Sequence, residues 1–200
     1  MVLIQPEFVT ECSEGKLESA KNKYNNLHNY YICANKFGLK TFYENIYEEI
    51  TYAFMYSCSE GHLEVAQWLI TLKEKPDIHA YYEYAFDSAC GNGHLGVAKL
   101  LYSLEDKPNI HIDNEHPFEI ACCNGHLEVA KWLYSLEDKP DIHINNDKIF
   151  YLICKSKKID LIKWIAPLYN NYVKIKNNKI ISWKIKDGLK DSSSDNSSDA

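Results

Sequence analysis

Three cysteine–histidine pairs are the residues of this sequence best suited to site chemistry. Each pair places a thiol and an imidazole four residues apart: Cys58 and His62, Cys90 and His94, and Cys122 and His126. Zinc takes such ligands, but it requires four of them at about 2.0–2.3 Å. Each pair supplies only two, and the next pair follows 32 residues later. We therefore expect the cysteines to pack in a core, the histidines to cap a turn by hydrogen bonding, and no metal ion or other cofactor to bind.

Two further sets of residues repeat at the same interval. One is a set of histidines, His79, His111 and His143; the other is a set of tryptophans, Trp68, Trp132 and Trp164, with Leu100 in the same place. We expect the histidines to brace neighbouring structural units, although a row of imidazoles could instead tune partner binding at about pH 6. Tryptophans can stack on nucleic-acid bases, but their regular spacing favours packing between repeats. The sequence shows no phosphate-binding glycine loop, no nucleophile elbow and no carboxylate pair at catalytic spacing, so we do not expect an enzyme.

The composition points to a soluble chain that binds neither nucleic acid nor a membrane. The 200 residues carry a net charge of −6, and all 22 basic residues are lysine. Arginine is the usual bidentate reader of phosphate and guanine, so its absence argues against nucleic-acid binding. The longest apolar run, residues 65–72, is far shorter than the ~20 residues that cross a bilayer, and the start lacks the basic segment of a secretion signal. Cysteines that stay reduced fit an intracellular, cytoplasmic protein.

The elements that position these residues follow from one phrase written three times. The sequence GHLEVAKWLYSLEDKP at 125–140 closely matches the segments at 93–108 and 61–76. Aligning the copies brings three kinds of residue into register: Phe54, Phe86, Phe118 and Phe150; Cys58, Cys90, Cys122 and Cys154; Gly61, Gly93 and Gly125. An earlier copy at 6–21 has Phe8, Cys12 and Gly15 in the same relative places, and the fourth copy lacks the glycine. Repetition in phase predicts a structural unit that stacks on its own copies.

Each copy predicts two short helices and a projecting segment. In the third copy, the residues from Phe118 to Cys122 form a first helix that a glycine cap at Gly125 ends. Apolar residues at helical spacing form a second helix, which must stop before Pro140. The stretch 140–148 carries turn residues between β-prone ones and predicts an extended finger or hairpin. One copy alone cannot bury its apolar stripes, but stacked copies can.

With these residues in place, the sequence resembles ankyrin-repeat proteins, and in particular the large sets that giant DNA viruses encode. The glycine–histidine turn before LEVA, the PDIH segment and HPFEIA at 116–121 carry the likeness, which covers residues 6–166. The resemblance implies an all-α, ankyrin-type helix-turn-helix solenoid with projecting fingers (hairpin-like loops) and a short C-terminal extension. The period of 32 departs from the roughly 33 residues of the family. The Thr and His of the family's usual helix-capping motif are replaced, by Tyr84 and Asp87 in one copy and by His116 and Glu119 in another.

Four regions are expected along the chain. They are N-terminal capping and divergent repeats at 1–60, regular repeats at 61–167, a C-terminal cap or hairpin at 168–187 and a disordered acidic tail at 188–200. Gly15 and Gly61 are 46 residues apart instead of 32, and residues 30–50 could hold an extra helix pair with Cys33 in the cysteine position. Two β-prone runs around Asn177 predict a C-terminal hairpin, with a final capping helix as the alternative.

Exposed positions that change between copies are free to contact a partner, and they lie mainly in the predicted fingers, at 80–85, 112–117 and 144–149. The nine candidates are Tyr81, Tyr82 and Glu83; Asp113, Asn114 and Glu115; Asn145, Asn146 and Asp147. Tyrosine is enriched at interfaces because it buries a large area while fixing few torsions, and solenoids bind extended surfaces on their concave side. We therefore expect a non-catalytic, monomeric module that binds a protein partner along the finger and concave face. The alternative is an adaptor that links a captured host protein to other machinery, such as a ubiquitin ligase, through residues 168–200.

Overall fold

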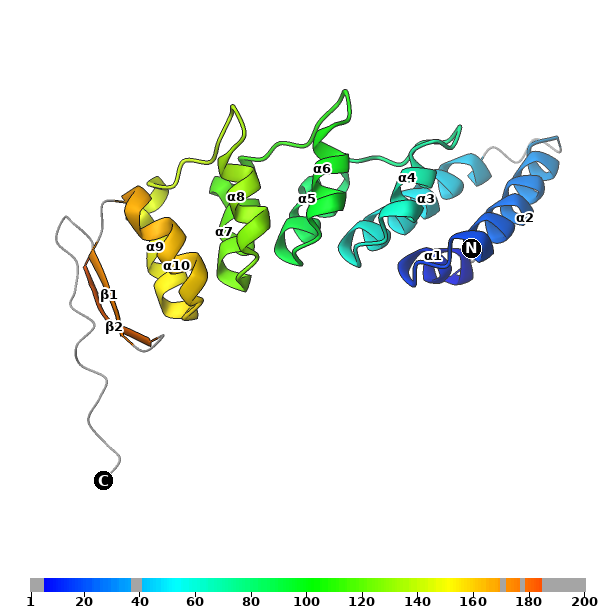
Figure 1. The fold of residues 1–200 in the computed structure, drawn as a ribbon. Helices are drawn as coiled ribbons and strands as arrows, with labels where there is room; N and C mark the ends of the chain where they lie inside the picture. The colour runs from blue at the N-terminus through cyan, green and yellow to red at the C-terminus, as the bar shows by residue number, and fades with distance from the viewer. Residues whose placement is uncertain (1–5, 37–40, 170–171, 177–178, 185–200) are drawn as a thin grey trace.

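The computed structural model describes residues 6–36, 41–169, 172–176 and 179–184. These residues fold into a row of helices followed by one hairpin (Figure 1). The helices are α1 (Pro6–Ser13), α2 (Leu17–Lys36), α3 (Thr41–Ser59), α4 (Leu63–Leu69), α5 (Ala80–Gly91), α6 (Leu95–Tyr102), α7 (Ile112–Asn124), α8 (Leu127–Tyr134), α9 (Ile144–Ser156) and α10 (Ile159–Ile165). The 3-10 helix η1 (Ala166–Tyr169) and the strands β1 (Tyr172–Lys176) and β2 (Lys179–Lys184) follow. Among the described helices, none is both long enough and apolar enough to cross a membrane.

The helices form pairs that stack side by side into an elongated array (Figure 1). The first helices of the pairs, which we call the inner helices, contact one another in the order α1, α3, α5, α7 and α9. The second helices, which we call the outer helices, are α2, α4, α6, α8 and α10; of these, α4, α6 and α8 contact one another in the same order. The predicted all-α solenoid of helix-turn-helix repeats is therefore confirmed.

A file of phenylalanines runs through the inner helices and forms the centre of the core. Each member is fully buried: Phe8, Phe54, Phe86, Phe118 and Phe150. The cysteines that follow one helical turn later are buried as well and are free thiols: Cys12, Cys58, Cys90, Cys122 and Cys154. Burying one phenylalanine side chain contributes about 1.5–3 kcal/mol, so each copy of the repeat adds a similar share to the stability of the stack. The predicted core positions are confirmed.

A left-handed glycine ends the inner helix of each regular pair. Gly93 has a φ of 82°, and the N–H of His94 donates back across the turn to Ala89 O at 2.8 Å. This is the Schellman arrangement, and it confirms the predicted glycine cap. In the last pair, which lacks the glycine, Lys157 adopts the left-handed conformation with a φ of 59°. Such a backbone costs a residue with a side chain about 1–2 kcal/mol.

The histidine after each glycine packs on the preceding pair instead of capping its own helix. A Cβ atom on Gly93 would lie 2.4 Å from Nδ1 of His126 in the next pair, so the ring occupies the space that the glycine leaves open. The histidines at the start of α4, α6 and α8 make no side-chain hydrogen bond to their own helix. The predicted capping of a turn by hydrogen bonding is therefore absent at the histidine's own helix and is found, for His62, at the turn of the preceding pair. The ring of His62 does donate a hydrogen bond, from Nε2 to Ser13 O at 2.8 Å, but this bond also crosses to the preceding pair.

The projecting segments lie between the helix pairs. Residues 70–79, 103–111 and 135–143, which we call the fingers, form the loops that rise above the array in Figure 1. In the described residues the fingers contain turns and bends and no strand. The predicted finger at 140–148 is therefore placed too late in the repeat, because its second half already begins α9. Buried residues at the base of each finger, such as Pro108 and Ile110, explain why the tips project while the bases stay fixed.

Longer helices fill the irregular interval near the N-terminus. Helix α2 has 20 residues and α3 has 19, whereas α6 and α8 have 8 each. An extra helix pair at 30–50 is therefore wrong, since α2 runs unbroken to Lys36 and α3 begins at Thr41. Cys33 lies within α2 and does not take the cysteine position of an inner helix. Both helices extend toward the edge from which the fingers project (Figure 1).

A hairpin covers the last helix pair. Strands β1 and β2 pair antiparallel, with Tyr172 opposite Lys184. Three partly buried side chains of the hairpin pack against the core: Val173, Ile175 and Ile180. Of the two predicted alternatives, the structure has the hairpin, and the capping helix is wrong. The two asparagines at the expected turn and the expected tail at 188–200 lie outside the described residues.

Candidate protein-binding surface

The residues predicted to contact a partner begin the inner helices, so their predicted place in the fingers is wrong. At the start of α5 and α7 their backbone is left-handed. In α5, Tyr81, Tyr82 and Glu83 have φ values of 53°, 57° and 61°. The corresponding residues of α7, from Asp113 to Glu115, have φ values of 48° to 68°. Residues with side chains rarely adopt this conformation. Contacts around the two turns must therefore offset its cost, and those contacts involve the third residue of each turn.

The third residue of the turn holds the next finger in place. Oε1 of Glu83 accepts a hydrogen bond from Asn109 N–H, and Oε1 of Glu115 accepts one from Asp141 N–H, both at 3.2 Å. In α3, where the backbone stays helical, Thr51 Oγ1 does the same for the first finger at 3.0 Å. Both glutamates are buried. The prediction that Glu83 and Glu115 are available to a partner is therefore wrong, because their carboxylates are used inside the protein.

A histidine then links each of these carboxylates to the following finger. Nδ1 of His79 lies 2.8 Å from Glu83 Oε1, and its Nε2 lies 3.1 Å from Asp106 Oδ2 in the next finger. Both ring nitrogens can donate at once only when the imidazole is protonated. The hydrogen bond to Glu83 is the main reason that the pKa of His79 is raised; burial opposes it, and Asp106 adds to it.

The same arrangement recurs one repeat later. His111 lies 2.9 Å from Glu115 and 3.0 Å from Asp138 of the third finger. Burial alone would lower the pKa of His111, but the hydrogen bonds to Glu115 and Asp138 outweigh it and raise the pKa. His143 pairs with Asp147 at 2.7 Å. The predicted bracing of neighbouring fingers is confirmed for His79 and His111.

Four of the nine predicted contact residues are exposed. They are Tyr81, Tyr82, Asp113 and Asn114. Asp147 is partly buried and bonded to His143. The side chains of Asn145 and Asn146 lie outside the described residues, although both positions belong to α9.

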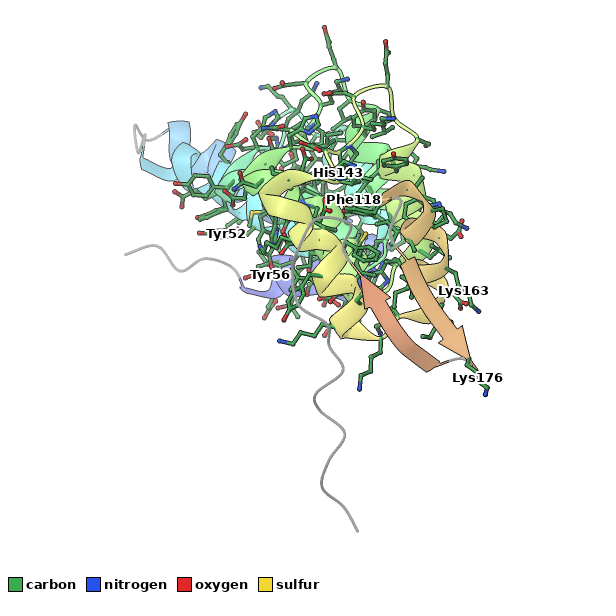
Figure 2. The ribbon with its side chains drawn as sticks, turned by 90° about the vertical axis from the view of Figure 1, so that its left-hand side faces the viewer. Tyr52, Tyr56, Phe118, His143, Lys163 and Lys176 are labelled. Carbon is green, nitrogen blue, oxygen red and sulfur yellow. The ribbon has the colours of Figure 1, made fainter. Side chains whose placement is uncertain are left out.

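Further tyrosines enlarge the exposed pair into an aromatic surface, which we call the tyrosine face. It consists of Tyr52 and Tyr56 on α3 and Tyr81, Tyr82 and Tyr84 on α5. The rings of Tyr52 and Tyr81 lie 5.7 Å apart between centroids and their hydroxyls are hydrogen-bonded, which joins the two helices. Figure 2 shows Tyr52 and Tyr56 on the side of the array opposite Lys163 of the outer helix α10. Four of the five side chains are exposed: Tyr56, Tyr81, Tyr82 and Tyr84.

Three members of this face were not predicted from the sequence. Tyr52 and Tyr84 occupy one position in successive repeats, and Tyr56 follows Tyr52 by one helical turn. These spacings could have placed the three side chains together on the inner helices.

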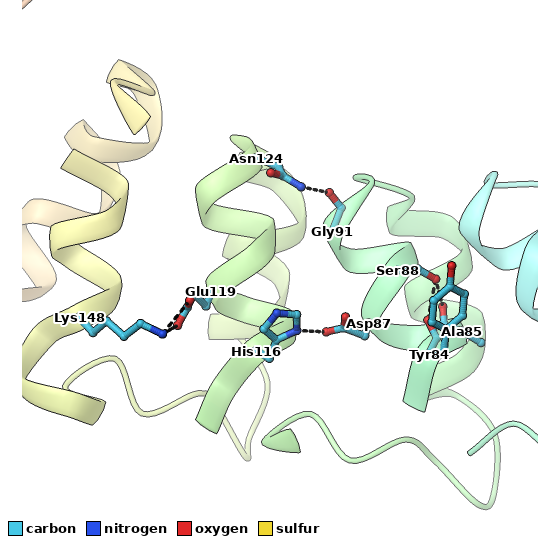
Figure 3. Close-up of polar contacts among 9 residues, drawn as sticks. All are labelled: Tyr84, Ala85, Asp87, Ser88, Gly91, His116, Glu119, Asn124 and Lys148. Carbon is cyan, nitrogen blue, oxygen red and sulfur yellow. Dashed lines mark hydrogen bonds and ion pairs between the residues drawn. The ribbon is translucent and has the colours of Figure 1, made fainter. Parts of the chain in front are cut away.

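Ion pairs join the inner helices farther along the same row of positions (Figure 3). His116 Nδ1 lies 2.7 Å from Asp87 Oδ1, and Lys148 Nζ lies 3.1 Å from both carboxylate oxygens of Glu119. His116 and Lys148 share the position of Tyr84, one and two repeats on. The residues that replace the usual capping motif therefore pair with each other across repeats. The Lys148–Glu119 pair also neutralises one of the acids of the inner helices.

A carbonyl near the end of α1, α3 and α5 accepts a hydrogen bond from the next repeat. Asn124 Nδ2 donates to Gly91 O at 2.6 Å (Figure 3), and Asn92 Nδ2 donates to Ser59 O at 2.9 Å. Where the sequence has Glu60 instead of asparagine, His62 bonds the preceding repeat, as described above. These bonds fix the register of each pair against the one before it.

The residues singled out for metal or base-stacking chemistry are used in packing. Burial raises the pKa of the thiols of Cys58, Cys90 and Cys122 above the usual range, which keeps them protonated and weakens them as metal ligands. Across the described part of the chain, no group of three or more metal-binding side chains comes together. Trp132 packs edge-on against Tyr102 of the previous outer helix, with centroids 5.8 Å apart. Packing of the tryptophans between repeats is thus confirmed.

The repeated helix pairs match a known family. A family model for ankyrin repeats, in three copies, matches residues 54–148. This segment, 95 of the 200 residues, is similar to ankyrin repeats. The match begins near the end of α3 and continues into the start of α9, and the helix pairs on either side continue the same stack. Ankyrin repeats indicate a protein–protein interaction module. No curated protein matches the chain.

Proposed function

We propose that the chain is a non-catalytic module that binds a protein partner through the tyrosine face and the exposed residues beside it on α7, Asp113 and Asn114. One observation carries this proposal: Tyr82 is 85% exposed and Tyr81 58% exposed, on helices that are otherwise well packed. Contiguous aromatic side chains in water mark interaction sites on soluble proteins. Tyrosine suits such a site, since its ring buries area and its hydroxyl still finds a hydrogen-bond partner.

The surface is also held rigid before any partner arrives. Glu83 and His79 fix the turn that carries Tyr81 and Tyr82 to the next finger. Tyr52 fixes the hydroxyl end of Tyr81. A surface that is ordered in the free protein loses little conformational entropy on binding, which favours affinity.

A photo-crosslinking amino acid in place of Tyr82 tests the proposal in the cell that makes the protein. We expect a covalent adduct with a partner protein. The same amino acid in place of Glu128, which is exposed on the outer helix α8, serves as the control and should give none. Adducts from residue 128 and none from residue 82 would contradict the proposal.

Replacing Tyr81 and Tyr82 together by alanine gives a second test with the identified partner. Both side chains are exposed, so the change should leave thermal unfolding nearly unchanged while it weakens capture of the partner. Equal loss of capture and of thermal stability would show instead that the two tyrosines support the fold.

The second candidate function is the adaptor, in which residues 168–200 contact further machinery such as a ubiquitin ligase. The position of the hairpin favours it: Lys176 lies on the side of the array away from Tyr52 and Tyr56 in Figure 2, so both surfaces could be occupied at once. Because the hairpin packs on the core, deleting all of 168–200 would also damage the last repeat. Deleting residues 186–200 and replacing Lys176 by glutamate is the sharper change. Loss of secondary proteins in a pull-down, with the first partner retained, is the expected result.

Three further points stay predictions from the sequence. They are a monomeric state, a cytoplasmic location and an origin in a giant DNA virus. Sedimentation of the purified chain, imaging of a tagged copy and sequencing of the source genome would test them in turn.

A further inference from the structure

We infer that the partner presents a cationic, extended segment to the tyrosine face, with lysine or arginine side chains that contact the rings and the neighbouring carboxylates. This inference rests on the proposed function and adds the chemistry of the partner to it. Three observations support it: the distribution of charge among the helices, the direction in which the finger lysines fold, and the acids left unpaired beside the tyrosines.

Charge is divided unevenly between the two rows of helices. The inner helices α3, α5 and α7 hold eight acidic residues, three, two and three respectively, and their sequences contain no lysine. The outer helices α4, α6, α8 and α10 hold three acidic residues and three lysines. The net charge of these three inner helices is therefore strongly negative, while that of these four outer helices is zero.

One lysine in each of the second and third fingers folds toward the outer helices. Lys107 Nζ lies 4.7 Å from the centroid of the Tyr102 ring on α6, and Lys139 Nζ lies 5.1 Å from that of Tyr134 on α8. These cation–π contacts hold the positive charge of these two lysines on the outer side, away from the acids of the inner helices.

Acids beside the tyrosine face remain open to solvent. Glu48 is exposed and stands one helical turn before Tyr52 on α3, and Asp113 is exposed at the start of α7. By contrast, Asp87 and Glu119 are already paired. An exposed cation–π contact is worth about 0.5–1 kcal/mol, and a nearby carboxylate adds attraction for the same cation. Lysine and arginine are the side chains that use both features.

The spacing of the inner helices favours an extended segment. Packed helices lie about 8–10 Å apart, and an extended chain rises about 3.3 Å per residue. A basic residue at every third position of such a segment would therefore meet α3, α5 and α7 in turn. A second copy of this chain is disfavoured as the occupant, since two acidic inner rows repel each other.

Selection from a library of random peptides tests the inference without knowledge of the natural partner. The bait is the full chain, and the peptides have about twelve residues, enough to cross three inner helices at about 3.3 Å per residue. We expect the selected peptides to be enriched in lysine and arginine. Their affinity should fall about tenfold or more in Glu48→Lys, since like charges at an interface are strongly disfavoured.

A charge-matched control separates a local contact from general electrostatics. Glu64 is exposed on the outer helix α4, so Glu64→Lys makes the same change in net charge away from the tyrosine face and should leave affinity nearly unchanged. Equal weakening by both variants would overturn the inference.

The other outcomes distinguish the two proposals. Peptides that lose binding in the Tyr81→Ala, Tyr82→Ala variant but show no cationic enrichment would overturn the inference and leave the proposed function standing. Selected peptides that bind the Tyr81→Ala, Tyr82→Ala variant as tightly as the parent chain would count against the proposed function itself. The absence of any selected peptide would do the same. If the chain forms a dimer and Glu48→Lys dissociates it, the tyrosine face binds a second copy of the chain. That result would overturn the inference.

Discussion

Replacing Gly93 with alanine should destabilise the stack at one defined junction. Gly93 has a φ of 82°, and a Cβ atom there would lie 2.4 Å from Nδ1 and 2.8 Å from Cε1 of His126. A left-handed residue with a side chain costs about 1–2 kcal/mol, and displacing a packed ring adds the about 1–3 kcal/mol that is typical of overpacking. We therefore expect the free energy of unfolding to fall by about 2–5 kcal/mol.

The chain contains a matched control three residues away. Gly96 lies in α6 and is exposed, and a Cβ atom there would meet only Leu63 Cδ2, at the ordinary contact distance of 3.5 Å. Because glycine weakens a helix interior, Gly96→Ala should raise the free energy of unfolding by about 0.5–1 kcal/mol. Replacing glycine with alanine is thus expected to lower the free energy of unfolding at Gly93 and to raise it at Gly96.

Urea unfolding followed by circular dichroism measures both variants. A double variant, Gly93→Ala with His126→Ala, should recover the part of the lost free energy of unfolding that comes from displacing the His126 ring. The interaction energy between the two substitutions should be about 0.5–3 kcal/mol. Strict additivity of the two changes, or a Gly93→Ala variant as stable as the parent chain, would refute the interlock between glycine and histidine.

Three further predictions concern the core, the finger histidines and the ion pairs. Phe118→Ala should lower the free energy of unfolding by about 3–5 kcal/mol, and a loss near zero would show that the phenylalanine file is not the core. The raised pKa values of His79 and His111 mean that their stabilisation is complete below their unfolded pKa of about 6.5 and is lost as the pH rises through the folded values. The urea midpoint should therefore fall when the pH is raised from below about 6.5 to about 8.5. The fall should be smaller when both histidines are replaced by glutamine. An equal fall in that double variant would contradict the role given to the two histidines. Glu119→Lys and Lys148→Glu should each lower stability by about 0.3–1 kcal/mol, whereas the swapped double variant should return to within about 0.5 kcal/mol of the parent; a double variant as weak as the sum of the singles would refute the pair.

The stacked architecture was predictable because its residues recur. Phe118 and Cys122 stand at the same positions in every copy, and only a shared interface requires the same side chain each time. The helix end at Gly125 was predictable for a similar reason, since a left-handed helix end favours glycine over other residues. The spacing of the finger histidines likewise predicted that they link neighbouring repeats.

The candidate surface was only partly predictable, because the decisive backbone conformation is set by tertiary contacts. Nothing local in the sequence indicates that Tyr81, Tyr82 and Glu83 are left-handed, since none of them favours that region. The turn exposes the two tyrosines and buries the glutamate against the next finger. Sequence variation between the copies indicated Tyr81, Tyr82 and Glu83 equally as contact residues. It could not distinguish an exposed side chain from a buried hydrogen-bond acceptor.

The length of α2 and α3 escaped prediction for a different reason. The interval between Gly15 and Gly61 contains no proline and no repeated phrase. Two long helices and an additional pair of short helices bury apolar residues at similar spacing. The spacing of apolar residues therefore could not distinguish these two arrangements. The lengthened start of α3 places Glu48 one helical turn before Tyr52 of the tyrosine face.

Hydroxyl-radical footprinting of the tyrosines, with and without the partner found by crosslinking, tests the central claim most directly. Tyr81 and Tyr82 should lose most of their reactivity in the complex, because a bound partner would cover their rings. Tyr102 and Tyr134, on the outer helices α6 and α8, should react as they do in the free chain. Protection of Tyr102 and Tyr134 with unchanged Tyr81 and Tyr82 would place the partner on the outer helices and contradict the account.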